Sequence, residues 1–141
     1  MKQLIKIGLL SLIVLVSSVN CQNGKRASDS TSGGSGLRSV YFDYDQSFIR
    51  NDQTSALQSN ASYLKSHGGT ATIEGHCDER GTNEYNLALG QRRSDAARNY
   101  LMNLGVGSAG MRTVSYGEEK SVCYEHDESC WWKNRRTDFR R

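Results

Sequence analysis

From Thr70 to Gly105 the chain reads as a short strand, a polar turn and a long helix. Thr70–Gly75 predicts the strand, and Thr82 is typical of a helix N-cap, with Glu84 well placed in the first helical turn. Gly105 is expected to end the helix. The apolar side of this helix is expected at Tyr85, Leu89, Ala96, Tyr100, Leu101 and Leu104.

Strands and helices continue to alternate on both sides of this segment. Val40–Tyr44, an aromatic and β-branched run, predicts a strand, and a helix capped by Asn51 or Asp52 is expected after it. Met111–Tyr116 predicts a third strand and Thr137–Arg141 a short fourth one. This alternation predicts an α+β fold with two layers, in which two main helices pack on one face of a small mixed sheet.

The first residues predict an export signal. Residues 1–20 begin with lysines and contain the apolar run Ile7–Val16, which is too short to cross a bilayer that needs about 20 residues. The following S-S-V-N-C resembles the bacterial lipoprotein box, in which the cysteine after the cut is lipidated; here that residue is Cys21. Ser18 and Asn20 replace the usual leucine and small residue of the box, and a secreted protein with an unpaired cysteine is the alternative.

The segment after Cys21 cannot bury an apolar face. Residues 22–36 contain one alanine and otherwise only polar residues and glycine. We therefore expect residues 21–37 to form a lipidated cysteine and flexible linker, and residues 38–141 to form one folded domain. From Cys21 onward 16 basic residues oppose 15 acidic ones, a net charge of +1, so the charge does not predict a nucleic-acid partner.

One acid and one guanidinium lie on either side of the turn between strand and helix. Asp78 follows the strand, and Arg93 lies on the helix, on the same side as Asn86 and Gly90. If they converge, they predict a site for a small zwitterion. Gly90 costs about 0.5 to 1 kcal/mol relative to alanine, so we interpret it as room for a ligand near the helix backbone. The alternatives are that both charges are solvated, or that Arg92, about 100° away, replaces Arg93.

Two of the four cysteines lie close together near the end of the chain. In an exported protein Cys123 and Cys130 predict a disulfide that closes a short loop. His126 lies between them and leaves a metal site as the alternative, with His76 or Cys77 as a further ligand. Because the spacing is not that of a common zinc site, we expect the disulfide and no metal.

Four motifs resemble a known family. Y-F-D-Y-D at residues 41–45, E-G-H-C-D-E-R-G-T-N-E-Y-N at 74–86, S-Y-G-E-E at 115–119 and N-R-R at 134–136 are similar, in this order, to the peptidoglycan-associated lipoproteins. Their folded part is an OmpA-like C-terminal domain, and the similarity spans about residues 40–136. It implies a β-α-β-α-β fold that grips the peptide stem of peptidoglycan through diaminopimelate.

The resemblance also implies individual roles. Asp78 matches the acid that pairs with the ammonium at the side-chain end of diaminopimelate, and Arg93 matches the arginine that pairs with the carboxylate there. The implied peptidoglycan-binding set is Asp78, Arg93, Asn86, Phe42, Asp43, Tyr44, Gly81 and Thr82, with Phe42–Tyr44 contributing backbone amides. We expect Asp78→Ala or Arg93→Ala to remove binding to sacculi without unfolding the domain. Asn134–Arg136 is interpreted as structural.

The family implies a non-enzymatic outer-membrane lipoprotein without a cofactor, whose domain faces the periplasm and tethers the outer membrane to the cell wall. The implied partners are the diaminopimelate of the peptidoglycan stem peptide, the outer membrane through the lipid on Cys21, and the periplasmic β-propeller protein of the Tol system. A role in envelope integrity and cell division as part of the Tol–Pal system follows from the same resemblance.

Two other functions stay open. Cys77 beside His76 is compatible with a cell-wall thiol peptidase or amidase. Neighbours on a strand point to opposite faces, so His76 is badly placed as its base, whereas His67 and His126 stay open. A small buried thiol is the simpler interpretation of Cys77. The second alternative is a protein-interaction module that does not bind the wall.

Overall fold

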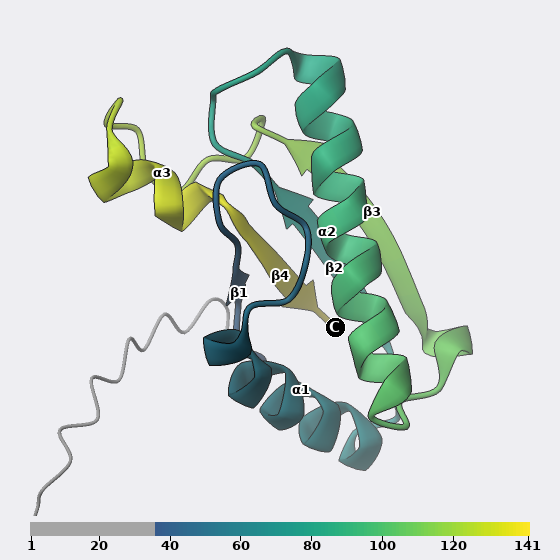
Figure 1. Cartoon of the computed structure of the whole chain (residues 1–141). Coiled ribbons are helices and arrows are strands. Elements are labelled where there is room, and N and C mark those ends of the chain that lie inside the picture. Colours follow the sequence, from purple (N-terminus) through teal and green to yellow (C-terminus); the bar gives the residue numbers. More distant parts are fainter. Residues whose placement is uncertain (1–35) are drawn as a thin grey trace, which may run out of the picture.

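The computed structural model describes residues 36–141 (Figure 1). The expected signal peptide, Cys21 and residues 22–35 of the expected linker lie outside the described residues. Leu37, the last residue of that linker, is buried and belongs to the hydrophobic core. Within residues 36–141, no helix has the length and apolar character needed to cross a membrane.

Strands and helices alternate throughout the described part of the chain. The elements are β1 (Val40–Tyr41), α1 (Thr54–Ser66), β2 (Ala71–His76), α2 (Asn83–Asn103), β3 (Met111–Gly117), α3 (Glu128–Asn134) and β4 (Arg136–Arg140). The strand order is β1-β4-β2-β3, with β2 and β3 parallel and β4 antiparallel to both of its neighbours. The domain therefore has the expected α+β class, with helices packed against a small mixed sheet.

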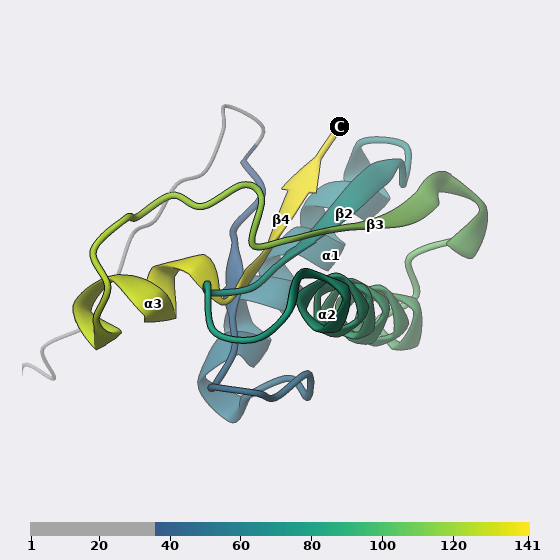
Figure 2. The same cartoon turned by 90° about the horizontal axis from the view of Figure 1, so that it is seen from above.

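The core lies between the sheet and the two longer helices (Figures 1 and 2). It joins Leu57, Ala61 and Leu64 of α1 and Ala97 and Leu101 of α2 to Ile73 of β2 and Phe139 of β4. Ile73 and Phe139 lie opposite each other in the antiparallel pair, as do Glu74 and Asp138. Because side chains alternate along a strand, Glu74 and Asp138 project from the opposite face of the sheet.

Two glycines allow α2 to lie directly on the sheet. A Cβ atom on Gly75 of β2 would lie 1.9 Å from the carbonyl oxygen of Gly90, and one on Gly90 would lie 2.3 Å from Oγ of Ser115. Both distances are far below van der Waals contact. The interpretation of Gly90 as room for a ligand is therefore wrong, because the strands occupy that space.

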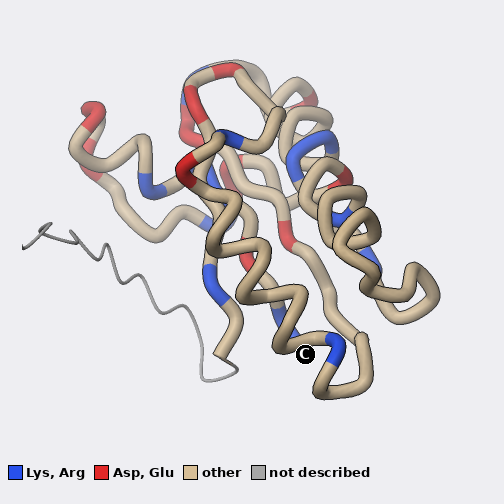
Figure 3. Tube along the Cα trace, turned by 60° about the horizontal axis from the view of Figure 1, so that its bottom comes forward, with Lys and Arg blue, Asp and Glu red and all other residues tan. Residues whose placement is uncertain are grey.

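The two long helices begin in different ways. The Oγ1 atom of Thr82 accepts a hydrogen bond of 3.2 Å from the backbone of α2, which confirms the predicted N-cap. The predicted cap of α1 is wrong, because Asn51 and Asp52 lie in a 3₁₀ turn and Asp52 pairs with Arg50. Lys65 lies in the last turn of α1, where a positive charge complements the helix dipole. Figure 3 shows how the basic and acidic residues are distributed along the described chain.

The apolar side predicted for α2 is confirmed in part, because Leu89 and Leu101 are buried and Tyr100 and Leu104 pack against the core, whereas two predicted positions are wrong. Tyr85 is 44% exposed, and Ala97 rather than Ala96 is fully buried. The buried residues are Asn86, Leu89, Gly90, Arg93, Ser94, Ala97 and Leu101. Because polar residues make up much of this side, the hydrophobic pattern identified only part of it.

All four strands have other bounds than predicted, by a single residue at one or both ends in β2, β3 and β4 and by more in β1. β1 ends at Tyr41 instead of Tyr44, because the chain turns at Asp43, whose carbonyl accepts a 3.2 Å hydrogen bond from the Gln46 amide. β4 begins at Arg136, and it lies between β1 and β2 in the interior of the sheet.

The helix α3 was not predicted from the sequence. Asp127 caps it by accepting a 2.7 Å hydrogen bond from the backbone of Ser129. A disulfide between Cys123 and Cys130 ties α3 to the segment that follows β3. Because Cys123 and Cys130 were interpreted only as the two ends of a disulfide loop, no helix was predicted for this segment.

Replacing both Cys123 and Cys130 by serine is expected to lower the free energy of unfolding by about 2 to 3 kcal/mol, because the short disulfide loop restricts the unfolded chain. Equilibrium urea denaturation measures this loss. Reduction of the wild-type protein with dithiothreitol should reproduce it. Equal stability of the oxidised, reduced and doubly substituted proteins would contradict the expectation.

Candidate functional site

A cavity of about 190 Å³ lies where the end of β2 meets the beginning of α2. Five residues of the sequence-predicted set line it: Tyr44, Asp78, Gly81, Asn86 and Arg93. The other lining residues are Asp45, Cys77, Arg80, Tyr85, Leu89 and Arg135. Cavities for drug-sized ligands span about 300 to 1,000 Å³, so this one suits a group of the size of an amino-acid end.

The carboxylate of Asp78 is buried, with 3% of the residue exposed, and pairs with two arginines. Its Oδ2 atom lies 2.6 Å from Nη2 of Arg80 and 3.1 Å from Nη1 of Arg135. Burial alone would raise the pKa of Asp78, but the hydrogen bonds from Arg80 and Arg135 outweigh burial and lower this pKa below its ordinary value of 3.8. Asp78 is therefore an anion at neutral pH.

This lowered pKa predicts how stability depends on pH. An acid whose folded pKa is depressed stabilises the fold above its ordinary pKa and loses that contribution as the pH falls through the folded value. The stability difference between the wild type and Asp78→Asn should therefore stay constant from pH 7 to pH 5 and shrink below pH 3.8. Urea denaturation across this range measures it. A difference that already shrinks between pH 7 and pH 5 would show that the pKa is not lowered.

Arg93 forms the inner wall of the cavity and is fully buried. Its guanidinium donates to the carbonyl oxygens of Gln46 at 2.8 Å, His76 at 2.8 Å and Asp43 at 3.1 Å. Within residues 36–141 it forms no ion pair with a carboxylate. Because these bonds join the loop after β1 and the end of β2 to α2, we expect Arg93→Ala to destabilise the fold, in contrast to the expectation from the sequence.

Two of the predicted residues, Asn86 and Gly81, line the cavity, and a third, Thr82, lies outside it. Nδ2 of Asn86 donates to Glu118 at 2.6 Å and to the carbonyl of Asp78 at 3.2 Å, which fixes this buried amide. Gly81 has a φ of 119°, in the region that favours glycine. Thr82 caps α2 and does not line the cavity.

Of the three predicted residues Phe42–Tyr44, only Tyr44 lines the cavity. The amide of Phe42 donates to the carbonyl of Arg135 at 2.9 Å, so it is not available to a ligand. The carboxylate of Asp43 faces away and pairs with Arg50 at 3.1 Å. Tyr44 lines the cavity through its ring, which lies 3.9 Å from the guanidinium carbon of Arg80.

Sequence reasoning missed the role of Arg80. Its guanidinium lies between two aromatic rings, 3.9 Å from the centroid of Tyr44 and 4.1 Å from that of Trp131. The neighbouring Glu79 does not pair with Arg80 and instead accepts hydrogen bonds from His126 and Trp131. Arg80 therefore covers Asp78 from the solvent side, where 28% of its side chain is exposed.

Arg135 is structural, as predicted, and also belongs to the site. Its Nε atom donates to the carbonyl of Phe42 at 3.1 Å, and its guanidinium pairs with Glu128 and Asp78. Hydrogen bonds to these acids raise its pKa, against the effect of burial. Its separation from Asp78 in the chain left no local signal of this contact.

The thiol of Cys77 is not arranged as a nucleophile. Burial raises its pKa to about 11, so the thiol stays protonated at neutral pH. Its hydrogen-bond partners are the carbonyl of Asn86 at 3.3 Å and Nη1 of Arg93 at 3.4 Å, and neither is a general base. The geometry therefore favours a structural role for this thiol.

Comparison with known sequences gives one family. The model of the OmpA family matches residues 41–135. The chain is 42% identical over 122 residues to a peptidoglycan-associated lipoprotein of Pseudomonas aeruginosa, covering 84% of this chain and 73% of that protein. It is 50% identical over 98 residues to a protein of the same name from Agrobacterium fabrum, covering 69% of this chain but only 55% of that protein.

Solved structures share the fold. The crystal structure of the peptidoglycan-associated lipoprotein from Burkholderia pseudomallei superposes with a TM-score of 0.70 at 52% identity, covering 72% of this chain and 87% of that one. The cell wall anchor of the type VI secretion system from Pseudomonas aeruginosa superposes with a TM-score of 0.62 at 19% identity, covering 72% and 76% of the two chains. The second similarity concerns the fold alone.

Proposed function

Because this chain belongs to the OmpA family, we propose that it binds peptidoglycan non-covalently through the amino-acid end of a diaminopimelate side chain. The observation that carries this proposal is a small cavity that holds a buried carboxylate, Asp78, and a buried guanidinium, Arg93. The relatives with 42% and 50% identity are named for their association with peptidoglycan, which supports the same ligand class.

Arg93 offers the place for the ligand's carboxylate. A buried charge is costly unless a charge of opposite sign compensates it, and the described partners of Arg93 are three carbonyl oxygens and a thiol. Its Nη2 atom donates one hydrogen bond, to Asp43, so its second N–H is free to meet a ligand carboxylate. A ligand carboxylate would therefore supply the negative charge that this wall of the cavity lacks.

Asp78 offers the place for the ligand's ammonium. Arg80 and Arg135 both contact its Oδ2 atom, but Arg80 is the more exposed of the two, at 28% against 6% of the side chain. We expect the ammonium to replace Arg80, which can keep its contacts with the rings of Tyr44 and Trp131. The two charges of one zwitterion would then meet one acid and one arginine.

The rest of the proposed function concerns how the domain is attached. A lipid on Cys21 would hold the outer membrane, and the polar segment 22–36 would connect it to the wall-binding domain in the periplasm. The family resemblance adds the β-propeller protein of the Tol system as a partner, and with it a role in envelope integrity and cell division. The tether requires no chemical step from the protein.

Sedimentation of the purified full chain with isolated sacculi tests the ligand. We expect the protein to sediment with the sacculi and to be released by free diaminopimelate. Pimelate, which has the same carbon chain and both carboxylates but no amine, should release it far less. Absence of sedimentation would contradict wall binding, and equal release by both compounds would contradict recognition of the zwitterion.

A further inference from the structure

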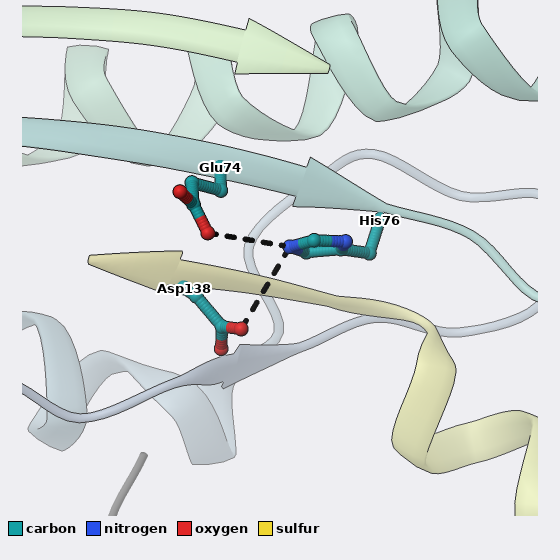
Figure 4. Close-up of side chains that lie close together, drawn as sticks. All are labelled: Glu74, His76 and Asp138. Carbon is teal, nitrogen blue, oxygen red and sulfur yellow. Dashed lines mark ion pairs between the residues drawn. The ribbon is translucent and has the colours of Figure 1, made fainter. Parts of the chain in front are cut away.

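Three side chains of metal-binding types meet on the sheet face opposite α1 and α2. Glu74 and His76 come from β2, and Asp138 lies across from Glu74 on β4 (Figure 4). Nε2 of His76 lies 3.9 Å from Oε2 of Glu74 and 3.7 Å from Oδ2 of Asp138. One donor atom of each residue lies within 4.8 Å of the other two. None of the three lines the cavity around Asp78.

His76 is buried without a hydrogen-bond partner. Only 2% of the residue is exposed, and neither ring nitrogen has a partner among residues 36–141. The distances to Glu74 and Asp138 are too long for hydrogen bonds. The ring of Tyr116 stacks on the imidazole with centroids 5.7 Å apart, which holds the ring plane in place. Nε2 therefore lies between two carboxylates and forms a hydrogen bond with neither of them.

We propose that Glu74, His76 and Asp138 bind one zinc ion that links β2 to β4. Two ligand atoms of one zinc ion lie at most about 4 Å apart, because each lies about 2.0 to 2.2 Å from the metal. The distances of 3.9 and 3.7 Å from Nε2 to the two carboxylate oxygens fall within that limit. One imidazole with two carboxylates suits zinc, whereas calcium and magnesium prefer oxygen ligands alone.

The protonation state of His76 permits this role. Burial lowers its pKa to about 4, and the positive charges of Arg136, Lys120 and Arg140 act in the same direction, against Asp138. The imidazole is therefore neutral at pH 7, with a lone pair available to a metal. No proton has to be displaced from it at that pH.

Neighbouring groups orient the carboxylate of Asp138. Its Oδ1 atom accepts a 2.6 Å hydrogen bond from Oγ of Ser39, and its Oδ2 atom accepts one of 3.0 Å from Nε of Arg136. Oδ2 has a second lone pair for a metal, so these contacts can act as the outer shell of the site. The charges of Arg136 and of Arg140, 3.5 Å from Glu74, oppose a cation, so we expect weaker binding than in a closed structural zinc site.

Titration of the chelator-treated full chain with zinc chloride, followed by calorimetry, tests the proposal. We expect the wild type to bind one zinc ion per molecule, and binding to be at least tenfold weaker in both Glu74→Gln and Asp138→Asn. His126→Gln, which removes an exposed histidine that contacts Glu79, is the matched control and should bind as the wild type does. Binding lost only in His126→Gln, or no binding by the wild type, would overturn the proposal.

Four further readouts separate metal binding from folding and from wall binding. Cobalt(II) should give visible ligand-field absorption in the wild type and not in Glu74→Gln, and circular dichroism should show both proteins folded. Zinc at a hundredfold excess over its dissociation constant should raise the wild-type Tm by about 5 °C or more. Glu74→Gln should still sediment with sacculi, since Glu74 lies outside the cavity; unchanged cobalt absorption in this variant would refute the site.

Discussion

Gly75→Ala is expected to lower the free energy of unfolding by at least about 4 kcal/mol, a large part of the stability of a small domain. The added Cβ would lie 1.9 Å from the carbonyl oxygen and 2.6 Å from the carbonyl carbon of Gly90. Both atoms belong to the backbone of α2, so no side-chain rotation relieves the clash. The helix would have to move away from β2 and would carry Asn86 and Arg93 with it, so binding to sacculi should be lost as well.

Gly107→Ala is the matched control. Nothing lies within 4 Å of the position of its Cβ, and its φ of −62° is ordinary for alanine. Its stability should stay within about 0.5 kcal/mol of the wild type. Urea denaturation followed by circular dichroism compares the three proteins. If Gly75→Ala unfolds at the same urea concentration as the wild type, α2 does not approach β2 as closely as described.

Asp78→Asn is expected to weaken binding to sacculi by about 10- to 150-fold, because a hydrogen bond to a charged group contributes about 1.5 to 3 kcal/mol. Asparagine keeps the size of the side chain but removes the charge that attracts an ammonium. Arg135 keeps its ion pair with Glu128, so the domain should remain folded. Asp52→Asn changes an exposed acid outside the cavity and is the control that should bind normally.

Arg93→Ala should lose binding for two reasons at once. It removes the proposed partner of the ligand's carboxylate, and it leaves the carbonyls of Asp43, Gln46 and His76 without their donor. Each such buried group costs about 1 to 3 kcal/mol when unsatisfied. Binding and urea denaturation should therefore be measured on the same preparations.

Full retention of Asp78→Asn on sacculi would be incompatible with the proposed ammonium site.

Much of the fold could be predicted because strands and helices alternate in the sequence and their ends carry clear signals such as Thr82 and Gly105. The polar part of the buried side of α2 could not be predicted from hydrophobicity, because Asn86, Arg93 and Ser94 occupy positions where a hydrophobic pattern expects apolar residues. Where a helix buries polar residues to form a site, its buried side does not follow the hydrophobic pattern by which buried helix sides are predicted.

The site was predictable only in part. The nearness of Asp78 and Arg93 follows from a strand, a turn and a helix that are continuous in sequence, and both residues line one cavity. The pairing of Asp78 with Arg135, 57 positions away, depends on α3 and β4 returning to the sheet. No local pattern reports such a contact. The meeting of Glu74 and His76 with Asp138 depends on the same long-range pairing of β2 and β4.

The most direct test of the account is the affinity of the full chain for a soluble stem peptide that carries diaminopimelate, compared with the same peptide acetylated on the side-chain amine. Acetylation keeps the carboxylate and removes only the positive charge that Asp78 is proposed to bind. The account predicts a loss of affinity of at least tenfold on acetylation in the wild type, and a much smaller loss in Asp78→Asn. Equal binding of both peptides by the wild type would contradict it.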